Sequence, residues 1–392
     1  MRRVGRHFLQ VPGPSNIPDR VLRAIDQPII DHRGPDFAEL AKRAFAGMKE
    51  IFNNSGSVFI FPGSGTGAWE AALANCLSPG DKVLMYETGH FSSLWRNVVT
   101  RFGLEAVMLP GDWRTGVDAD AIEKALRQDS HHLIKAVCVV HNETSTGCIS
   151  SIADVRQAMD GASHPALLMV DAVSSLGSIE FRQDGWGVDV AVAASQKGLM
   201  LPSGLGFTSV SAKALEASKT ARLPRSFWAW DEMAKANADG FFPYTPATNL
   251  IYGLVEAFAM MREEGMERVF ARHERLGEAT RRAVRAWDLE IQCSEPRHYS
   301  PVVTGVRMPD GQSADGVRKI IDERFNMSLG AGLSKLADKV FRIGHLGDFN
   351  ELMLAGALSG VEMGLHLAGV KVASSGIDAA LAYLKQNGAG KN

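Results

Sequence analysis

The chain lacks long hydrophobic runs, is poor in cysteine and has almost no excess of either charge. No apolar stretch approaches the roughly 18 residues of a membrane-spanning helix, so we do not expect an integral membrane protein. The 42 basic and 44 acidic residues give a formal net charge of −2. No basic block stands out, so neither nucleic acid nor an anionic membrane surface is expected as a partner. The basic residues Arg2, Arg3 and Arg6 precede a Pro-Gly-Pro segment, which is not typical of a signal peptide.

The chain has four cysteines, Cys76, Cys138, Cys148 and Cys293, and none of them is paired as Cys-x-x-Cys. A protein of this length buries a large core and does not depend on disulfides. We therefore expect reduced cysteines and a cytoplasmic protein. A metal site is not expected either, because the chain has no His-Glu-x-x-His motif.

Short apolar segments that alternate with helical ones are abundant between residues 58 and 210. We expect strands at 58–61, 82–86, 105–109, 134–140, 166–170, 190–194 and 205–210, with helices between most of them. Apolar strands separated by helices are typical of a mostly parallel sheet covered on both faces. The sequence therefore predicts an α/β fold whose large domain has a mostly parallel seven-stranded sheet. Ligands of such sheets bind beyond the carboxyl ends of the strands.

Three parts are predicted along the chain. Residues 1–20 form an extended N-terminal arm, because Pro12, Pro14 and Pro18 prevent a regular helix. Residues 21–264 form the large domain, and residues 265–392 a smaller C-terminal α+β domain. The elements expected near and after this boundary are helices at 249–264, 266–287, 314–325, 350–367 and 377–385 and strands at 289–292, 302–306 and 340–343.

A lysine stands at the end of one of the most apolar strands. Residues 190–194 are followed by Ser195-Gln196-Lys197-Gly198. Because a charge is costly to bury, such a lysine either extends to solvent or is desolvated for chemistry. Desolvation lowers the pKa of a lysine and leaves a nucleophilic amine, which is the state that Schiff-base chemistry needs.

A glycine-rich loop, Gly63-Ser64-Gly65-Thr66-Gly67-Ala68, follows the first strand of the predicted sheet and opens a helix. Its backbone N–H groups and the helix N-terminus suit a phosphate. The loop also fits the pattern Gly-x-Gly-x-x-Gly/Ala of dinucleotide sites, with Glu87 at the end of the next strand. An NAD-dependent dehydrogenase is therefore an alternative at this point, and a tight structural turn is another.

Two further charged residues stand at strand positions. Asp171 ends the strand at 166–170, where its carboxylate could pair with a ligand cation such as a pyridinium N–H. Arg342 lies between apolar strand residues, where it could bind a carboxylate in bidentate fashion. Nicotinamide chemistry has no use for Lys197, whereas pyridoxal phosphate uses a phosphate site, an aspartate, a lysine and an arginine together.

These residues belong to motifs that resemble those of class V pyridoxal-phosphate aminotransferases of fold type I. Within that family the resemblance is strongest to the serine–glyoxylate and alanine–glyoxylate aminotransferases, and it covers nearly the whole chain. The motifs are Val11-Pro-Gly-Pro-Ser-Asn16, Phe61-Pro-Gly-Ser-Gly-Thr-Gly-Ala-Trp-Glu70, His141-Asn-Glu-Thr-Ser-Thr-Gly147, Val170-Asp-Ala-Val-Ser-Ser175, Gly185-Trp-Gly-Val-Asp189, Ser195-Gln-Lys-Gly198, Tyr244-Thr-Pro246 and Phe341-Arg-Ile-Gly-His-Leu-Gly347.

The resemblance implies a role for each matching residue. Lys197 would carry pyridoxal phosphate covalently and act with Asp171 in catalysis, Asp171 binding the ring nitrogen. The other cofactor contacts implied are Val173 and Phe91 on the two ring faces, Thr144 near the ring hydroxyl, and Ser64, Gly65, Thr66 and Gln196 on the phosphate. Thr245 would reach the phosphate of a partner subunit, since family members are homodimers with shared active sites.

The resemblance also implies a substrate pocket. Arg342 would bind the substrate carboxylate, and Asn16 of the arm and Arg33 are further candidates, with Arg33 suited to a second carboxylate. The arm would cross to the partner subunit near the active site. The chain departs from the alanine–glyoxylate type at Phe242, where that type often has a tyrosine that contacts the phosphate.

The activity implied is the transfer of the amino group of a small L-amino acid to glyoxylate by a ping-pong mechanism. Serine is the expected donor, which would give hydroxypyruvate and glycine. Alanine and aspartate are the alternatives, and the NAD-dependent dehydrogenase is a more distant one. The expected partners are these small molecules and a second copy of the chain.

Overall fold

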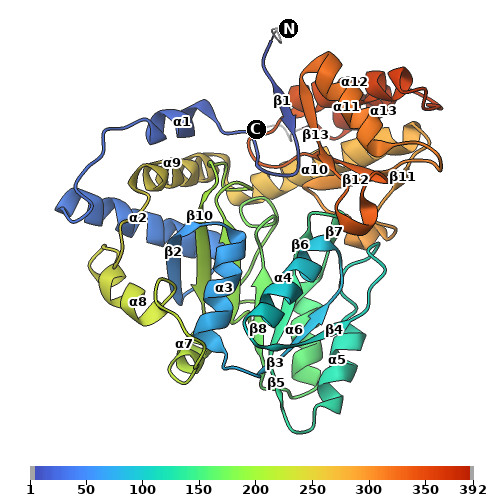
Figure 1. The fold of residues 1–392 in the computed structure, drawn as a ribbon. Coiled ribbons are helices and arrows are strands. Elements are labelled where there is room, and N and C mark those ends of the chain that lie inside the picture. Colours follow the sequence, from blue (N-terminus) through green and yellow to red (C-terminus); the bar gives the residue numbers. More distant parts are fainter. Residues whose placement is uncertain (1–4, 389–392) are drawn as a thin grey trace.

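The structure is a computed structural model that describes residues 5–388 (Figure 1). Its larger sheet contains seven strands in the order β2-β10-β9-β8-β5-β3-β4. These strands are β2 (Ser57–Gly63), β3 (Lys82–Tyr86), β4 (Glu105–Leu109), β5 (Ile134–Val140), β8 (Leu167–Asp171), β9 (Val190–Ala194) and β10 (Gly204–Val210). Only β10 runs antiparallel to its neighbours, β2 and β9. The prediction of a mostly parallel seven-stranded sheet is therefore confirmed.

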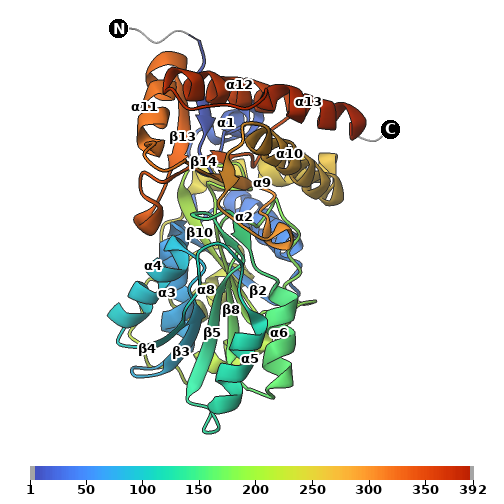
Figure 2. The same ribbon diagram turned by 90° about the vertical axis from the view of Figure 1, so that its right-hand side faces the viewer.

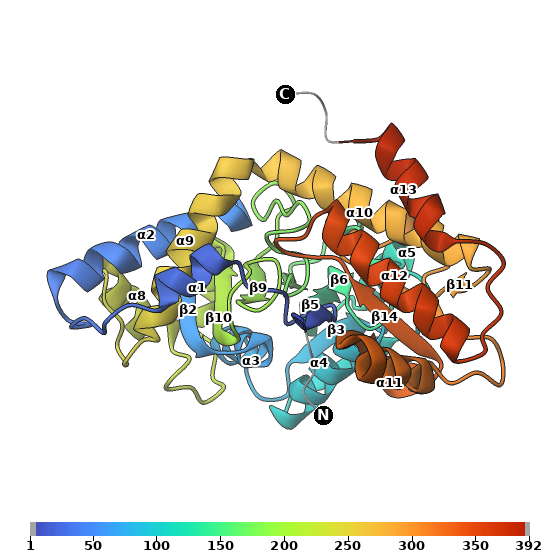
Figure 3. The ribbon, with the colours of Figure 1, turned by 90° about the horizontal axis from the view of Figure 1, so that it is seen from above.

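Both faces of this sheet are covered by helices, as Figure 3 shows from above. One face packs against α2 (Pro35–Phe52), α5 (Ala119–Gln128), α6 (Ile152–Gly161) and α9 (Thr248–Glu264). The other packs against α3 (Gly65–Cys76), α4 (His90–Arg101), α7 (Ala212–Ser218) and α8 (Trp230–Ala238). Because successive strand residues point to opposite faces, Val137 and Val139 join the first core, and Ala136 and Cys138 the second.

A smaller sheet of five strands lies beside the first, in the order β1-β13-β14-β12-β11 (Figure 2). Its strands are β1 (Phe8–Gln10), β11 (Glu290–Ile291), β12 (Val303–Arg307), β13 (Met327–Ala331) and β14 (Val340–Gly344). The helices packed with it are α10 (Met266–Ala286), α11 (Ala314–Phe325), α12 (Glu351–Leu367) and α13 (Gly376–Gln386). The predicted division at residue 265 falls at Gly265, between α9 and α10.

The remaining elements are short. They are α1 (Asp19–Ile25), the paired β6 (Asn142–Glu143) and β7 (Cys148–Ile149), and two single turns of 3-10 helix at Pro296–His298 and Ser334–Leu336. All four cysteines are free and buried. Across residues 5–388, no helix is both long enough and apolar enough to cross a bilayer.

Some elements were not expected from the sequence. Helix α8 was missed because it buries only Trp230 and Met233, which leaves too short an apolar stripe to recognise. Strand β13 was missed because it contains Gly330 and is stabilised by pairing with the distant β1 and β14. The short helix α7 was also missed; it buries only Ala214.

The N-terminal arm joins the two sheets. Its strand β1 pairs in parallel with β13 of the smaller sheet. Its next turn then packs against the end of the larger sheet, where Ser15 N donates to Gln196 O at 3.0 Å. The predicted crossing of the arm to a partner subunit stays a prediction, and its residues 1–4 lie outside the described part of the chain. So do residues 389–392 of the predicted small domain.

Candidate active site

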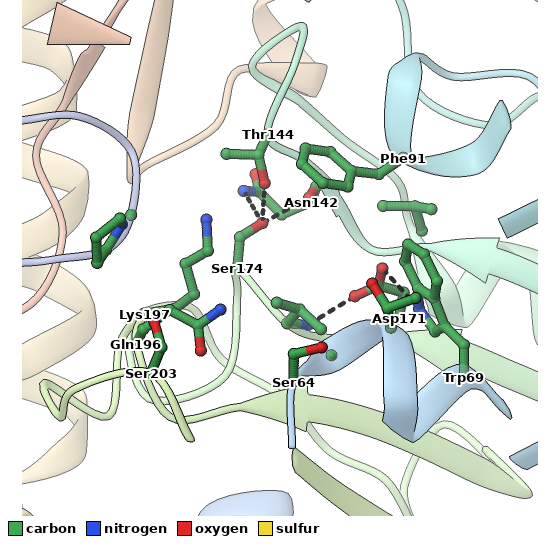
Figure 4. A pocket seen from close by; sticks show the side chains of 16 residues that line it. Ser64, Trp69, Phe91, Asn142, Thr144, Asp171, Ser174, Gln196, Lys197 and Ser203 are labelled. Atoms are coloured by element: carbon green, nitrogen blue, oxygen red, sulfur yellow. Dashed lines mark hydrogen bonds between the residues drawn. The ribbon is translucent and has the colours of Figure 1, made fainter. Parts of the chain in front are cut away.

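Nine of the predicted site residues line one cavity of about 220 Å³ at the carboxyl ends of the parallel strands (Figure 4). They are Ser64, Gly65, Thr66, Phe91, Thr144, Asp171, Val173, Gln196 and Lys197. Asp171 is the last residue of β8, and Lys197 lies three residues after the end of β9. Neighbouring parallel strands end at one edge of a sheet, which brings together residues that are distant in sequence.

Asp171 is a buried carboxylate with a bonded partner on each oxygen. It is 4% exposed; its Oδ1 accepts from Val173 N at 2.7 Å and its Oδ2 from Trp69 Nε1 at 3.1 Å. Burial raises the pKa of Asp171 to about 7, and the Val173 N–H opposes that rise. The carboxylate is therefore poised to share a proton with a basic ring nitrogen brought against it.

Lys197 is the buried amine opposite this carboxylate (Figure 4). Its Nζ donates to the carbonyl oxygen of Pro12 at 2.7 Å. Burial and, to a smaller extent, the positive charge of Arg342 lower the pKa of Lys197 to about 8, while Asp171 acts in the opposite direction. The neutral amine, which a nucleophile or general base requires, is therefore far more populated near neutral pH than in an ordinary lysine.

Glycine at position 13 makes the approach of the arm to this lysine possible. Gly13 has a φ of 109°, and a Cβ built there would lie 2.4 Å from Lys197 Nζ. Next to it, Ser15 Oγ donates to Lys197 O at 2.8 Å. The arm therefore fixes both the backbone and the side chain of Lys197.

The start of α3 forms an anion cradle at one end of the cavity. Ser64 precedes the helix and Gly65 and Thr66 open it, so their N–H groups have no partner within the helix. A Cβ at Gly65 would lie 2.7 Å from Val173 Cγ2, which explains why glycine is needed beside the cavity. Gln196 also lines the cavity, and its amide NH2 is a donor suited to an anion, whereas its Oε1 is a buried acceptor with no hydrogen-bond partner.

A hydroxyl and amide network forms the opposite wall (Figure 4). Oγ of Ser174 accepts from Thr144 Oγ1 at 2.8 Å and from Asn142 Nδ2 at 2.9 Å, and it donates to Asn142 O at 2.7 Å. This arrangement leaves Oδ1 of Asn142 buried without a partner. The wall thus has an unused acceptor for a polar group of a ligand.

Arg342 lies beside this wall and not on the cavity surface itself. It stands on β14 and is 7% exposed. Its Nη1 donates to Thr144 O at 2.9 Å and its Nε to Ala331 O at 2.8 Å. Burial lowers the pKa of Arg342 to about 10, and the negative charge of Glu143 opposes this. The guanidinium stays charged at neutral pH.

Glu143 supports both Arg342 and Phe91. It is fully buried and accepts from the backbone N–H groups of Phe91 at 3.2 Å and of Ser92 at 3.1 Å, at the start of α4. A Cβ at Gly89 would lie 2.5 Å from Glu143 Cγ, so glycine allows this contact. A carboxylate at a helix N-terminus is electrostatically favourable and fixes the backbone that carries the Phe91 ring.

Three predicted site residues lie away from the cavity. Asn16 Nδ2 donates to Leu9 O, and Asn16 lines a different hollow, formed by the arm. Arg33 is exposed in the turn before α2, and Thr245 is exposed before α9. Phe242, at the position where a tyrosine is common, packs against Phe37 and Phe45 in the core.

Several residues of the site were not predicted as such. They are Gly13, Trp69, Val140, Asn142, Ser174 and Ser203, all of which line the cavity. Trp69 and Asn142 lie inside recognised motifs, but their contacts to Asp171 and Ser174 depend on the fold. No group of metal-ligating side chains occurs among the residues that the structure describes.

The cavity therefore combines three kinds of chemistry. An anion cradle lies at the start of α3, a buried carboxylate lies at the end of β8, and an amine of lowered pKa lies between them and the arm. Such a site can hold an anionic group at one end and a protonated ring nitrogen at the other. The Lys197 amine then faces the space between these two ends of the cavity.

Comparison with known proteins gives related sequences and structures. The family described as Aminotransferase class-V matches residues 7–342. The chain is 52% identical to a serine–glyoxylate aminotransferase of Methylorubrum extorquens, over 98% of each protein. It is 45% identical to an L-aspartate–glyoxylate aminotransferase of Paracoccus denitrificans, over 96% of each. Its fold matches the crystal structure of pyridoxamine–pyruvate aminotransferase from Mesorhizobium loti, with a TM-score of 0.91, 27% identity and 98% of each chain covered.

Proposed function

The chain belongs to the class V aminotransferase family, and from this premise we propose that it moves the amino group of L-serine to glyoxylate. The products would be hydroxypyruvate and glycine, and the cofactor pyridoxal phosphate. One observation carries the proposal: Lys197, Asp171 and the start of α3 converge on a single cavity. Among similar proteins, two serine–glyoxylate aminotransferases, at 52% and 48% identity, support serine as the donor. Alanine and aspartate are the alternatives, aspartate being the donor named for the relative at 45% identity.

The residues around the cavity suit pyridoxal phosphate. They offer hydrogen-bond donors for a phosphate, and they include a buried polar atom that only a ligand could satisfy. Oδ1 of Asn142 is a buried acceptor without a partner, the amide NH2 of Gln196 is a donor at the cavity, and the N–H groups that open α3 are free for an anion. We propose that Ser64, Gly65, Thr66 and Gln196 hold the phosphate and that Asp171 binds the ring nitrogen. Val173 and Phe91 would cover the two faces of the ring, with Thr144 near its hydroxyl. When bound, pyridoxal phosphate supplies an electron sink for the charge left on the substrate Cα after proton removal.

Each residue of the chain then has a distinct task. Lys197 Nζ, with a pKa near 8, would anchor the cofactor and, once free, would take the proton from the substrate Cα and deliver it to the cofactor carbon that is bonded to the amino nitrogen. Asp171 keeps a negative charge beside the ring nitrogen, which favours its protonated form. Arg342 binds the substrate carboxylate, because its Nη2 is not used by the bonds to Thr144 and Ala331. The carbonyl of Pro12 holds the lysine amine in place.

An NAD-dependent dehydrogenase is no longer needed to explain the glycine loop. Glu87, the residue that such an enzyme would use for the ribose, bonds to Trp113 at 2.8 Å and to Lys335 at 2.5 Å, away from the cavity. Membership of the aminotransferase family also leaves no role for a nicotinamide.

We further propose a cytoplasmic homodimer in which Thr245 reaches the phosphate site of the second subunit and Asn16 and Arg33 serve its substrate pocket. All three residues lie away from their own cavity, which is what a shared site requires. Four free, buried cysteines are in keeping with a reducing compartment. Sedimentation analysis should give twice the 42.4 kDa chain mass, and Thr245→Ala should weaken cofactor binding about tenfold. A monomeric protein would contradict this part of the proposal.

A two-stage reaction tests the proposed function. The protein is loaded with pyridoxal phosphate and mixed with serine, alanine or aspartate in separate samples, without glyoxylate. We expect serine to change the visible absorption most rapidly, with release of one equivalent of hydroxypyruvate. Glyoxylate added afterwards should restore the original spectrum and yield glycine. A protein whose spectrum serine leaves unchanged, but which reacts with alanine or aspartate, would identify one of the alternative donors instead.

A further inference from the structure

A tryptophan supports the buried carboxylate from behind. Trp69, on α3, is 2% exposed, and its Nε1 donates to Oδ2 of Asp171 at 3.1 Å (Figure 4). The backbone N–H of Val173 donates to the other oxygen. Both donors favour the ionised form of the carboxylate, because a protonated carboxyl group presents one acceptor fewer.

The position of this indole is fixed by packing. Trp69 stacks on Trp95 of α4, with ring centroids 5.5 Å apart and an interplanar angle of 10°. Trp95 is fully buried, and both rings belong to the core between the larger sheet and its helices. The indole N–H therefore cannot follow Asp171 if the carboxylate moves, and it defines where Oδ2 lies.

The other charges near Asp171 act in opposite directions. Glu143 raises the pKa of Asp171 and Lys197 lowers it, while burial raises it most. Among the described residues, Trp69 is the one side chain that bonds directly to this carboxylate. A donor in that place makes Asp171 a weaker base, so that a proton shared with a bound ring nitrogen remains on the nitrogen.

We propose that Trp69 is a positioning residue that acts through Asp171: its indole N–H orients the carboxylate and keeps the proton on the ring nitrogen of the cofactor. Trp69 has this role only if the proposed function holds. The role follows from the contact itself and is distinct from the cofactor contacts assigned to Asp171 and Val173.

Two matched substitutions isolate the hydrogen bond from the stack. Trp69→Phe keeps an aromatic ring against Trp95 and removes the donor. Trp95→Phe removes an indole N–H from the same stack, and that N–H has no hydrogen-bond partner. Each full-length variant is loaded with pyridoxal phosphate labelled at the ring nitrogen, for nitrogen NMR, and its dissociation constant for the cofactor is measured by equilibrium dialysis.

Trp69→Phe should bind the cofactor about tenfold more weakly, since hydrogen bonds to charged groups contribute on this scale. Its ring-nitrogen resonance should move toward that of the unprotonated form, and kcat for the amino donor should fall more than KM changes. Trp95→Phe should stay within about twofold of the unmodified protein. In an Asp171→Ala background, Trp69→Phe should have little further effect on binding.

The possible outcomes separate this role from the proposed function. Equal binding and equal resonances in Trp69→Phe and Trp95→Phe would overturn the role, while normal loading would leave the proposed function intact. An undiminished effect of Trp69→Phe in the Asp171→Ala background would also overturn it, since Trp69 would then act by packing. An unmodified protein that binds no pyridoxal phosphate would remove both.

A measurement on the unmodified protein covers the case in which Trp69→Phe does not fold. In protein labelled at the tryptophan indole nitrogens, the Trp69 N–H resonance should move as Asp171 titrates near pH 7. The movement should be absent in Asp171→Ala. A Trp69 resonance that is insensitive to pH in the unmodified protein would contradict the proposed contact.

Discussion

The two sheets contribute to the cavity in different ways. The larger sheet contributes residues that stand at or just after its strand ends, such as Asp171 and Lys197. The arm and the smaller sheet act from behind the cavity lining through Pro12, which accepts from Lys197 Nζ, and Arg342, which donates to Thr144 O; these partners lie 185 and 198 residues away in sequence. In the proposed function the first group would carry out the chemistry, and the second would hold the amine and bind the substrate carboxylate. The difference suggests that chemistry and substrate binding can be impaired separately.

The largest effect is expected from the larger sheet. Lys197→Ala removes the amine that we propose anchors the cofactor and moves the proton, so turnover should fall by at least about a thousandfold. The visible absorption of loaded protein should be lost as well. Lys213→Ala is a suitable control, because Lys213 donates to Ala166 O, just before the start of β8 and thus at the opposite end of that strand from Asp171. Steady-state rates within tenfold of normal in Lys197→Ala would refute the assignment.

A substitution in the smaller sheet should have a smaller effect, and it should impair kcat/KM for the amino donor and not cofactor affinity. Arg342→Gln removes the cation that we propose binds the substrate carboxylate, so kcat/KM for the amino donor should fall about a hundredfold. Cofactor affinity should change little, since Arg342 does not line the cavity. Arg318→Gln is the matched control, because Arg318 Nε also donates to a carbonyl of β13, that of Leu329. A loss of cofactor binding equal to the loss of kcat/KM would show that the two regions are not separable.

The same contrast explains what the sequence could reveal. Asp171 and Lys197 follow apolar strands directly, and Gly65 opens a helix after another strand, so local pattern and motif resemblance were enough to find them. Arg342 was identified as an anion-binding candidate, but its packing behind Thr144 was not foreseen. The contacts of Trp69 to Asp171 and of Pro12 to Lys197 join separate elements, and no periodicity within either segment encodes them. Strand β13 was missed for the same reason.

A substitution in the N-terminal arm should have an effect of intermediate size. In Gly13→Ala a new Cβ would lie 2.4 Å from Lys197 Nζ, at a φ of 109° that L-residues rarely adopt. We expect covalent loading with pyridoxal phosphate to slow about tenfold, because the amine loses the Pro12 carbonyl that holds it.

Gly80→Ala is the control for backbone strain alone. Gly80 also has a positive φ, of 85°, but a Cβ there would meet nothing within 4 Å. Both variants should lose similar thermal stability, and only Gly13→Ala should load slowly. Equal loading rates in the two variants would show that the arm does not position the lysine.

The smallest expected effect is the shift in the pKa of Lys197, in the larger sheet, when the charge of Arg342, in the smaller sheet, is removed. Burial and, to a smaller extent, the positive charge of Arg342 lower the pKa of Lys197 to about 8. The rate of loading of cofactor-free protein should therefore rise with pH through a midpoint near 8, since only the neutral amine attacks an aldehyde.

In Arg342→Gln the cation is gone, the ammonium form of Lys197 becomes less unfavourable, and the midpoint should move up by about half a pH unit. Arg318→Gln should leave it in place, because the pKa of Lys197 is not set by that residue. A midpoint that moves down, or that stays near the ordinary lysine value of 10.5 in the unmodified protein, would mean that the amine is not desolvated. The reactivity of the Lys197 amine would then not depend on its burial beneath the arm.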